Sequence, residues 1–469
     1  MSDGSYDRSA YVSATVAEPG DLDPYTPGRG SLDFGVSRYE LTLDYRLASN
    51  RLSGRAVITG KARTTLTAIS LDLSGLRVSK VQLDSIRVQR FLQRGDRLII
   101  TPEVRIASGA EFRLDIRYEG NPRPVESLWG DIGWEELTDG VLVAGQPTGA
   151  SSWFPCNDHP SSKSMYTFRV TTDAGYRVVC NGKLVSRMVK SSREIWVYEQ
   201  PEPMAAYLAT VQIGRYQLLN IHPSARASGR GPWSAQEPED DVVPQFAAVP
   251  AKLAERAAAG LYRQSEMMET FVSCFGPYPF QSGYTVVVAD DFLEIPLEAQ
   301  SLSILGRNHL GTEWNSQRLV AHELAHQWFG NSVTLALWRD IWLHEGFACY
   351  AEWIWSEASG SLSADERAME AWRALSLEPQ DLLTGDPGAE EMFDDRVYKR
   401  GALALHSLRR VWGDSTFFGL LQAWTARFRY GSVSTEDFVE LAASRCRAAD
   451  ADPRALLDQW LYRTALPDL

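Results

Sequence analysis

Hydrophobic and polar residues alternate along much of the first half of the chain. The alternation is clearest over residues 39–45, 69–73, 112–118 and 195–198, and Gly, Asn and Asp residues separate such runs. Strict alternation places apolar side chains on one face of a β-strand and polar side chains on the other. The pattern therefore predicts a largely antiparallel β domain.

The second half of the chain has a different hydrophobic pattern, which is typical of helices with a few buried strands. Residues 251–273 are predicted to be helical, and the β-branched run 284–289 is predicted to be a buried strand. Three later segments begin with a helix-capping signal: Ser363 with Glu366, Ser434 with Asp437, and Asp452 with Pro453. We therefore expect an α+β protein whose C-terminal part is mainly helical.

A chain of 469 residues is too long for one simple core, so two or three domains are expected. We place a boundary in the proline-containing segment 201–216, with an N-terminal domain over residues 1–208 and a second domain over residues 209–469. Residues 1–30 are rich in Gly, Pro, Asp and Ser and are expected to form an arm with little regular structure. The polar segment 223–245 is expected to be an exposed loop.

The overall composition indicates which kinds of partner and which cellular compartment suit this chain. The net charge of −13 argues against nucleic acid or an anionic membrane as the main partner. The first ten residues contain no apolar run, and no later stretch reaches the ~20 apolar residues of a spanning helix, so neither a signal peptide nor a membrane anchor is expected. The five cysteines lack C-x-x-C spacing and indicate thiols in a reducing cytoplasm, with a catalytic cysteine as the weaker alternative.

The pattern H-E-x-x-H occurs once, at His322, Glu323 and His326, and Glu345 follows after 18 intervening residues. On a helix, positions i and i+4 share a face, so the two histidines can bind one cation while Glu323 reaches a water molecule beside it. A second helix would bring Glu345 back as the third ligand. Two nitrogens and one oxygen with an open fourth position form a catalytic zinc site. A chance match is the alternative, but only seven histidines are present in the chain.

The sequence around this motif carries a resemblance to a known family. The run HELAHQWFGN from His322, the threonine Thr334 and the run WRDIWLHEGFA over residues 338–348 resemble the aminopeptidase N family of gluzincin zinc metallopeptidases, which includes the leukotriene hydrolases. The resemblance implies an N-terminal β-saddle domain followed by a thermolysin-like mixed α/β zinc-peptidase domain. His344 stands where the family has asparagine. It is interpreted as a packing variant, because its side chain leaves the helix about 100° from Glu345.

The resemblance also implies residues that bind substrate. Gln146 matches a glutamine that lines the first substrate pocket, although from the residues alone a glycine- and proline-rich turn with a buried Trp153 is the favoured interpretation of its segment. Glu298 lies in the segment 296–299 (PLEA), where the family has G-A-M-E-N, and matches the glutamate that holds the free amine of the substrate. Glu294 is the rival for this role. Tyr398 matches a tyrosine that donates a hydrogen bond to the oxyanion, and a packed aromatic residue is the alternative.

These expectations combine into a zinc-dependent aminopeptidase that acts on peptides with a free N-terminus. Zinc would polarise the scissile carbonyl, Glu323 would act as general base, and Glu298 with Gln146 would fix the N-terminus. Two alternatives remain open: another zinc hydrolase of the same fold, such as a specialised peptidase or an epoxide hydrolase, and a non-catalytic peptide-binding protein. The oligomeric state stays open.

Larger members of the family continue into a further helical domain. Here roughly 120 residues follow Glu345, so we expect a two-domain form with a more open cleft. The acidic run 386–395 could line a pocket for a basic side chain, and a solvated loop is the simpler interpretation.

Overall fold

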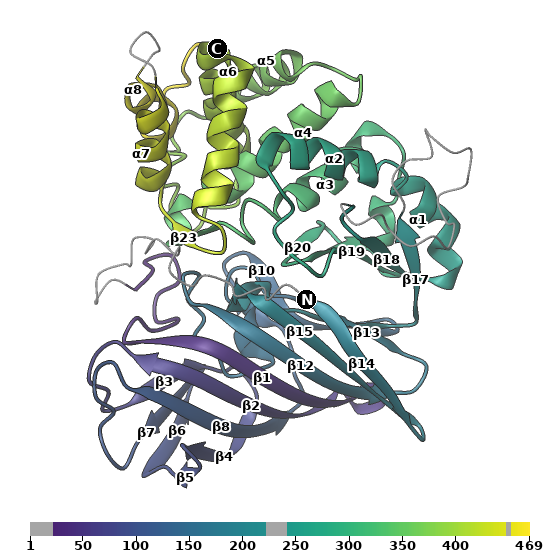
Figure 1. Cartoon of the computed structure of the whole chain (residues 1–469), viewed down its shortest axis with the longest axis vertical. Helices are drawn as coiled ribbons and strands as arrows, with labels where there is room; N and C mark the ends of the chain where they lie inside the picture. The colour runs from purple at the N-terminus through teal and green to yellow at the C-terminus, as the bar shows by residue number, and fades with distance from the viewer. Residues whose placement is uncertain (1–21, 222–241, 447–451) are drawn as a thin grey trace, which may run out of the picture.

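β-strands make up the N-terminal half of the chain and helices dominate the C-terminal half, as the hydrophobic pattern predicts (Figure 1). The computed structural model describes residues 22–221, 242–446 and 452–469. Residues 1–21 of the expected arm and most of the expected loop at 223–245 lie outside the described residues.

The N-terminal domain is built on an eight-stranded sheet with the order β14-β15-β12-β1-β2-β8-β4-β5. Its strands are β1 (Phe34–Arg46), β2 (Arg51–Ala62), β4 (Arg77–Leu83), β5 (Ile86–Arg87), β8 (Glu111–Gly120), β12 (Lys163–Asp173), β14 (Lys183–Lys190) and β15 (Arg193–Ala205). Neighbouring strands are antiparallel, as predicted, except for the parallel pair β1 and β12. The alternating apolar positions of β1, such as Tyr39, Leu41 and Leu43, are buried.

Two smaller sheets complete this domain. One has the order β13-β16-β11-β10-β9 and the other the order β3-β7-β6. Their strands are β3 (Ile69–Asp72), β6 (Arg90–Arg94), β7 (Arg97–Thr101), β9 (Val125–Ser127), β10 (Gly130–Leu137), β11 (Gly140–Ala144), β13 (Arg177–Cys180) and β16 (Val211–Gly214). The core contains packed aromatic rings, among them Trp153, whose ring lies edge-to-face with that of Phe154 at a centroid distance of 4.4 Å.

The second domain contains a five-stranded sheet with the order β17-β18-β19-β21-β20 and a group of helices. Its strands are β17 (Tyr216–Ile221), β18 (Gln245–Pro250), β19 (Tyr284–Ala289), β20 (Leu297–Ala299) and β21 (Leu302–Gly306), with a short pair β22 (Thr334–Leu335) and β23 (Ser432–Val433). Its helices are α1 (Ala254–Gly260), α2 (Gln264–Phe275), α3 (Trp314–Ala325), α4 (Trp342–Ala358), α5 (Ala364–Leu375), α6 (Asp395–Arg427), α7 (Thr435–Arg445) and α8 (Pro453–Leu461).

Local predictions in this domain are confirmed with one correction. The buried strand 284–289 is β19, and capping boxes begin α5 and α7. The helix predicted over residues 251–273 is wrong as a single element, because α1 ends at Gly260 and α2 starts at Gln264. Glycine has a low helix propensity, which favours a break of the helix after Gly260.

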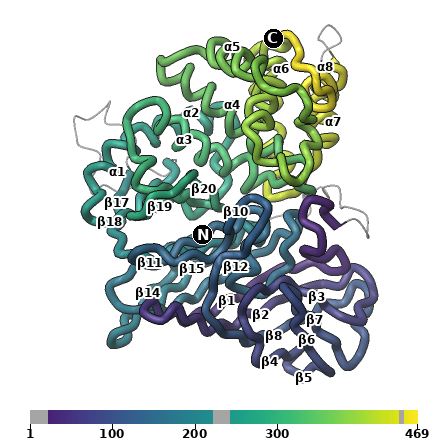
Figure 2. The backbone as a smooth tube through the Cα atoms, turned by 180° about the vertical axis from the view of Figure 1, so that it is seen from behind, coloured from purple at the N-terminus to yellow at the C-terminus, as the bar shows by residue number. Residues whose placement is uncertain are grey.

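The two domains are stacked, with the helices on one side and the large sheet on the other (Figures 1 and 2). Strand pairing passes from one domain to the other at Arg215, since β16 pairs with β13 and β11 whereas β17 pairs with β18. The boundary at residue 208 stays a prediction. In the part of the chain that the structure describes, no helix is long and apolar enough to cross a membrane.

The described end of the N-terminal arm joins the two domains. Residues 22–30 have no regular secondary structure, as expected, but Asp23 is fully buried and its carboxylate accepts a hydrogen bond from the Trp338 backbone N–H at 2.6 Å. The Tyr25 hydroxyl donates to Asp386 and accepts from the Gly388 N–H at 2.6 Å. The first part of the acidic run 386–395 is therefore attached to the N-terminal arm and not only solvated.

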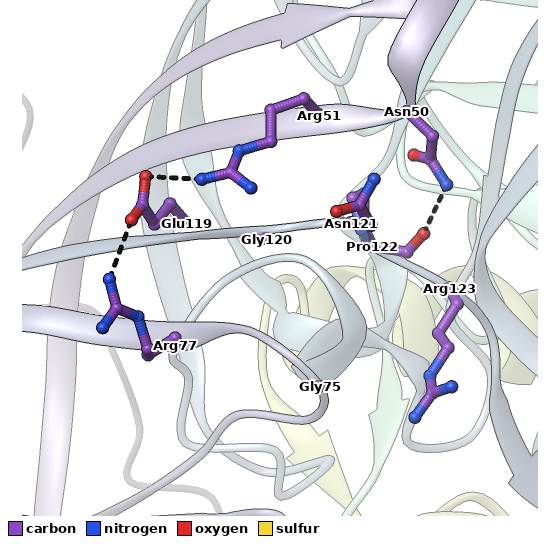
Figure 3. A pocket seen from close by; sticks show the side chains of 9 residues that line it. All are labelled: Asn50, Arg51, Gly75, Arg77, Glu119, Gly120, Asn121, Pro122 and Arg123. Atoms are coloured by element: carbon purple, nitrogen blue, oxygen red, sulfur yellow. Dashed lines mark hydrogen bonds and ion pairs between the residues drawn. The ribbon is translucent and has the colours of Figure 1, made fainter.

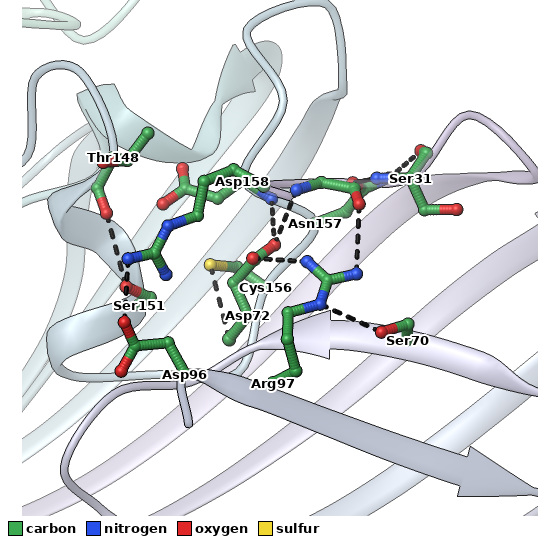
Figure 4. A network of polar contacts seen from close by, with 12 residues as sticks. Ser31, Ser70, Asp72, Asp96, Arg97, Thr148, Ser151, Cys156, Asn157 and Asp158 are labelled. Carbon is green, nitrogen blue, oxygen red and sulfur yellow. Dashed lines mark hydrogen bonds and ion pairs between the residues drawn. The ribbon is translucent and has the colours of Figure 1, made fainter. Parts of the chain in front are cut away.

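A buried polar network anchors the segment that carries Gln146 (Figure 4). The carboxylate of Asp72 accepts hydrogen bonds from the backbone N–H groups of Gly30 at 3.0 Å and Asp158 at 3.1 Å, and it pairs with Arg97 at 2.5 Å. Asp72 also exchanges backbone hydrogen bonds with Cys156. This network holds Gly30, the end of β3 and the stretch around Cys156 together through several hydrogen bonds. It fixes the segment between Gln146 and β12 against the N-terminal sheets.

Candidate active site

Helices α3 and α4 bring the three predicted metal ligands together. His322 lies in the last turn of α3, His326 follows that helix at its C-cap, and Glu345 lies in the first turn of α4. All three side chains are buried. The Glu345 Oε2 atom lies 3.3 Å from His322 Nε2 and 3.4 Å from His326 Nε2, and the three ligand atoms lie within 4.8 Å of one another.

The other nitrogen of each histidine is occupied by a protein partner. His322 Nδ1 lies 2.8 Å from Glu352 Oε1, and His326 Nδ1 lies 3.0 Å from the Phe329 carbonyl oxygen. Such partners fix the orientation and tautomer of a metal-binding imidazole, and here they leave both Nε2 atoms directed at Glu345. Two imidazole nitrogens and one carboxylate oxygen form a donor set that suits a catalytic zinc ion, so the residues present fit this metal.

The charges in the site favour a cation. Burial lowers the pKa of His322, but its hydrogen bonds with Glu345 and Glu352 outweigh this effect and raise the pKa to about 9. Burial likewise opposes the charge of His326, yet the charges of Glu345 and Glu298 raise its pKa to about 10. Without a metal, protons on the imidazoles therefore balance the carboxylates. Metal binding displaces such protons.

Glu323 and Glu298 lie beside the three ligands. Their carboxylate oxygens, together with a nitrogen of His326, form a second group within 4.8 Å. Among the described residues, neither Glu323 Oε2 nor Glu298 Oε1 has a hydrogen-bond partner, although both atoms are buried. Burial raises the pKa of both groups, that of Glu323 to about 7. Burial of an acceptor without a partner costs free energy of folding. These two oxygens are therefore placed for a donor that the described residues do not supply.

Glu298 and Glu294, the two acids considered for binding the substrate amine, lie in different surroundings. Glu298 lies on β20, whose partner strand is β21, and it faces the histidines. Glu294 lies before this strand and is exposed to solvent. Of the two acids, only Glu298 forms a close group with Glu323 and His326 among the described residues.

Tyr398 comes from the first turn of α6 and completes this side of the site. Its ring stacks on His322, with ring centroids 6.0 Å apart and an interplanar angle of 17°. Burial, and after it the charge of Glu345, raises the pKa of the Tyr398 hydroxyl well above its ordinary value. The hydroxyl therefore keeps its proton and can act as a hydrogen-bond donor.

Gln146 lies just after β11 in the N-terminal domain. It follows Gly145, whose backbone packs so closely on Tyr207 that a Cβ atom there would lie 2.4 Å from the Tyr207 carbonyl oxygen. Burial, and then the charges of Glu298 and Glu345, raises the pKa of Tyr207 well above its ordinary value. In the described part of the chain the amide nitrogen of Gln146 is buried and has no hydrogen-bond partner.

Glu352 is a site residue that sequence reasoning missed. It lies seven positions after Glu345 on α4, hence on nearly the same face of the helix, and it holds His322 Nδ1. Arg318 on α3 pairs with its other oxygen at 3.3 Å. Burial raises the pKa of Glu352, but the nearby charge of Lys399 and the hydrogen bond to His322 lower it to about 2. The seven-residue spacing was the signal that could have found it.

His344 takes the packing role expected for it. Its Nε2 atom accepts a hydrogen bond from the Leu335 backbone N–H at 2.8 Å. Burial lowers the pKa of this imidazole to about 3, so it stays neutral. It fixes the chain just before α4 and is not among the metal-ligating residues of the described chain.

A cavity of about 550 Å³ lies elsewhere, at the edge of the N-terminal domain (Figure 3). Arg51, Arg77, Glu119 and Arg123 are among its lining residues. Glu119 already pairs with Arg51 at 2.9 Å and with Arg77 at 3.1 Å. Exposed ion pairs of this kind contribute little, and none of the residues of the metal group lines the cavity. We therefore assign the chemistry to the site between α3 and α4.

Comparisons with known proteins agree with this site. The sequence matches the Peptidase M1 N-terminal domain over residues 36–208 and the Peptidase family M1 domain over residues 260–460. The crystal structure of an M1 zinc metallopeptidase from Deinococcus radiodurans is similar, with a TM-score of 0.85 and 30% identity over 95% of this chain and 98% of that chain. A mutant of the Deinococcus radiodurans enzyme bound to a Tyr-Ser-Ala substrate has a TM-score of 0.84 and 29% identity, with the same coverage.

Two archaeal relatives are longer. Leucyl aminopeptidase of Saccharolobus solfataricus is 24% identical over 92% of this chain and 54% of that protein. Probable aminopeptidase 1 of Sulfurisphaera tokodaii is 23% identical over 92% of this chain and 53% of that protein. The chain thus spans about half the length of these two relatives.

Proposed function

Because the chain belongs to peptidase family M1, we propose that it is a zinc-dependent aminopeptidase that removes the N-terminal residue of peptides. The observation that carries this proposal is the unpartnered Glu298 oxygen beside the three-ligand metal site. A metal site alone suits many hydrolases. A buried carboxylate next to it suits a substrate with a free ammonium group.

His322, His326 and Glu345 would hold the zinc ion. When bound, zinc supplies a Lewis acid that polarises the scissile carbonyl and makes water more acidic. Glu323 takes the proton from the attacking water and carries it to the leaving amine. Its unpartnered Oε2 atom and a pKa raised by burial to about 7 suit a group that accepts and returns a proton.

Tyr398 and Glu298 act on opposite ends of the scissile residue. The Tyr398 hydroxyl donates a hydrogen bond to the oxyanion of the tetrahedral intermediate, where a preorganised donor is commonly worth about 3 kcal/mol. Glu298, with Gln146, holds the substrate ammonium group. Because this anchor lies at a fixed distance from the scissile bond, one residue is removed at a time.

Peptides with a free N-terminus are the proposed substrates. The Deinococcus radiodurans neighbour was crystallised with Tyr-Ser-Ala, and mutants of a two-domain M1 enzyme were crystallised with L-tryptophan and with L-arginine. We place the chain in the cytoplasm, where its buried thiols Cys156, Cys180 and Cys349 would stay reduced.

A panel of aminoacyl fluorogenic substrates tests the proposal. Hydrolysis should require zinc, stop on addition of a chelator, and return when zinc is restored. N-acetylated versions of the same substrates should remain intact, and Glu323→Gln serves as the control for contaminating peptidases. Equal cleavage of acetylated and free substrates would favour a different hydrolase of this fold. Zinc binding without any hydrolysis would favour a non-catalytic binding protein.

A further inference from the structure

Lys163 is one of the residues through which the N-terminal domain contacts the segment between the two zinc helices. It is the first residue of β12. Its ammonium Nζ donates hydrogen bonds to oxygens of the second domain: Asn331 O at 3.0 Å, Ser332 O at 2.8 Å, Thr334 Oγ1 at 2.8 Å and, at 3.3 Å, Gly431 O. An ammonium group has three donors, so the three shortest contacts satisfy it. All three lie in the loop after His326.

The same loop sets the orientation of His326. The Asn331 N–H donates to the His326 carbonyl oxygen at 3.0 Å, and the Phe329 carbonyl oxygen lies 3.0 Å from His326 Nδ1. A carbonyl partner on Nδ1 keeps the proton on that nitrogen and leaves Nε2 for the metal. Movement of the loop would therefore turn the imidazole away from its position 3.4 Å from Glu345 Oε2.

The loop also holds the strand that carries Glu298. The side-chain amides of Asn331 and Gln327 donate to the Ala299 carbonyl oxygen at 3.0 and 3.2 Å. The Gln327 side-chain oxygen accepts from the Ser301 N–H at 2.8 Å. These bonds are on both sides of the turn that follows β20. The position of Glu298 relative to the zinc ligands thus depends on the loop that Lys163 holds.

These contacts act through their number and geometry, since burial lowers the pKa of the Lys163 amine to about 7. The side chain is buried among the oxygens that it contacts, and three hydrogen bonds from one group hold a short stretch of chain in one arrangement. Three of them converge on residues 331–334, within eight positions of His326. We propose that Lys163 is a positioning residue, which sets the metal-facing orientation of His326 and the distance of Glu298 from it. The inference rests on the zinc site of the proposed function.

Lys163→Met, which keeps the length and removes the donors, tests the proposal. The matched control is Lys183→Met, which changes an exposed lysine at the start of β14. Partners outside the ligand set of a metal commonly change affinity or activity by 10-fold or more, so zinc release to excess chelator should accelerate about tenfold in Lys163→Met. The visible spectrum of the cobalt-substituted protein, which reports ligand geometry, should change in Lys163→Met. Lys183→Met should match the parent in both measurements.

A lysine that only joins the domains would give a different result. Lys163→Met would then unfold at a lower temperature, but its zinc release would stay within twofold of the parent and its cobalt spectrum would be unchanged, which overturns the proposal. If Lys163→Met does not fold, a pair of variants at Thr334 tests the proposal instead. Thr334→Val, which loses the acceptor, should release zinc faster than Thr334→Ser, which keeps it, and equal rates overturn the proposal. A parent protein that binds zinc but hydrolyses no peptide would refute the proposed function and leave these comparisons valid.

Discussion

Replacement of Glu352 by glutamine should weaken zinc binding although none of the three ligands is changed. Glu352 Oε1 lies 2.8 Å from His322 Nδ1, and Oε2 lies 3.3 Å from an Arg318 nitrogen. Glutamine has nearly the same volume and keeps a carbonyl acceptor for Nδ1. It removes the negative charge that strengthens this hydrogen bond and makes His322 more basic, and it also ends the ion pair with Arg318.

The expected loss of zinc affinity follows from the charge on the acceptor of that hydrogen bond. A hydrogen bond to a charged group contributes about 1.5–3 kcal/mol, and a neutral one about 0.5–1.5 kcal/mol. Loss of the charge at Glu352 should therefore cost the zinc complex about 1–1.5 kcal/mol, which is roughly a 5- to 10-fold weaker affinity. The sign is fixed because a more basic imidazole binds zinc more tightly.

Competition with a chromophoric chelator at fixed pH measures this affinity. The matched control is Glu357→Gln on the same helix, where the carboxylate pairs with Arg409 at 2.8 Å and belongs to neither metal-ligating group. Thermal unfolding of both metal-free variants reports any loss of packing. A zinc affinity of Glu352→Gln within twofold of the parent, or an equal loss in both variants, would refute the reasoning.

Four further substitutions separate the proposed roles. Glu323→Gln should retain zinc and lose about 10²- to 10⁴-fold in kcat; full turnover in steady-state assays would exclude it as the base. Glu345→Ala should lose zinc by elemental analysis, and stoichiometric metal would reassign the third ligand. Tyr398→Phe should lower kcat about 100-fold with little change in KM, as expected for one lost oxyanion donor; an unchanged kcat removes it from the mechanism. Glu298→Ala should abolish the preference for free over N-acetylated substrates, and a retained preference would point to another anchor.

Much of the fold could be read from local sequence signals. The alternating runs of the first half lie in strands, and the capping boxes at Ser363 and Ser434 begin helices where expected. These signals act within a few residues, so a single sequence contains them in full. The pairing of β1 with β12 was not readable, because it joins residues about 125 positions apart and is set by the packing of the whole sheet.

Some residues of the site were likewise predictable from local spacing, and others were not. The metal group at His322, His326 and Glu345 was predicted from spacing alone, because two helices in a hairpin bring fixed positions together. Glu352 was readable by the same argument. Lys163 was not, since its partners lie 168 or more residues away in the chain and meet it only where two domains pack.

The balance of charge explains why such a site would prefer a free amine. Three carboxylates, Glu298, Glu323 and Glu345, converge on two histidines in a buried site. A zinc ion would contribute two positive charges, and one substrate ammonium group would complete the neutralisation of all three. An acetylated N-terminus would leave one buried carboxylate without a cation, which is costly in a site removed from water. Glu352 does not enter this balance, because the charges of Lys399 and, at 3.3 Å, of Arg318 compensate its own. Discrimination between free and blocked peptides would therefore be an electrostatic property of the assembled site, and Glu298→Gln should reduce it by removing charge without removing volume.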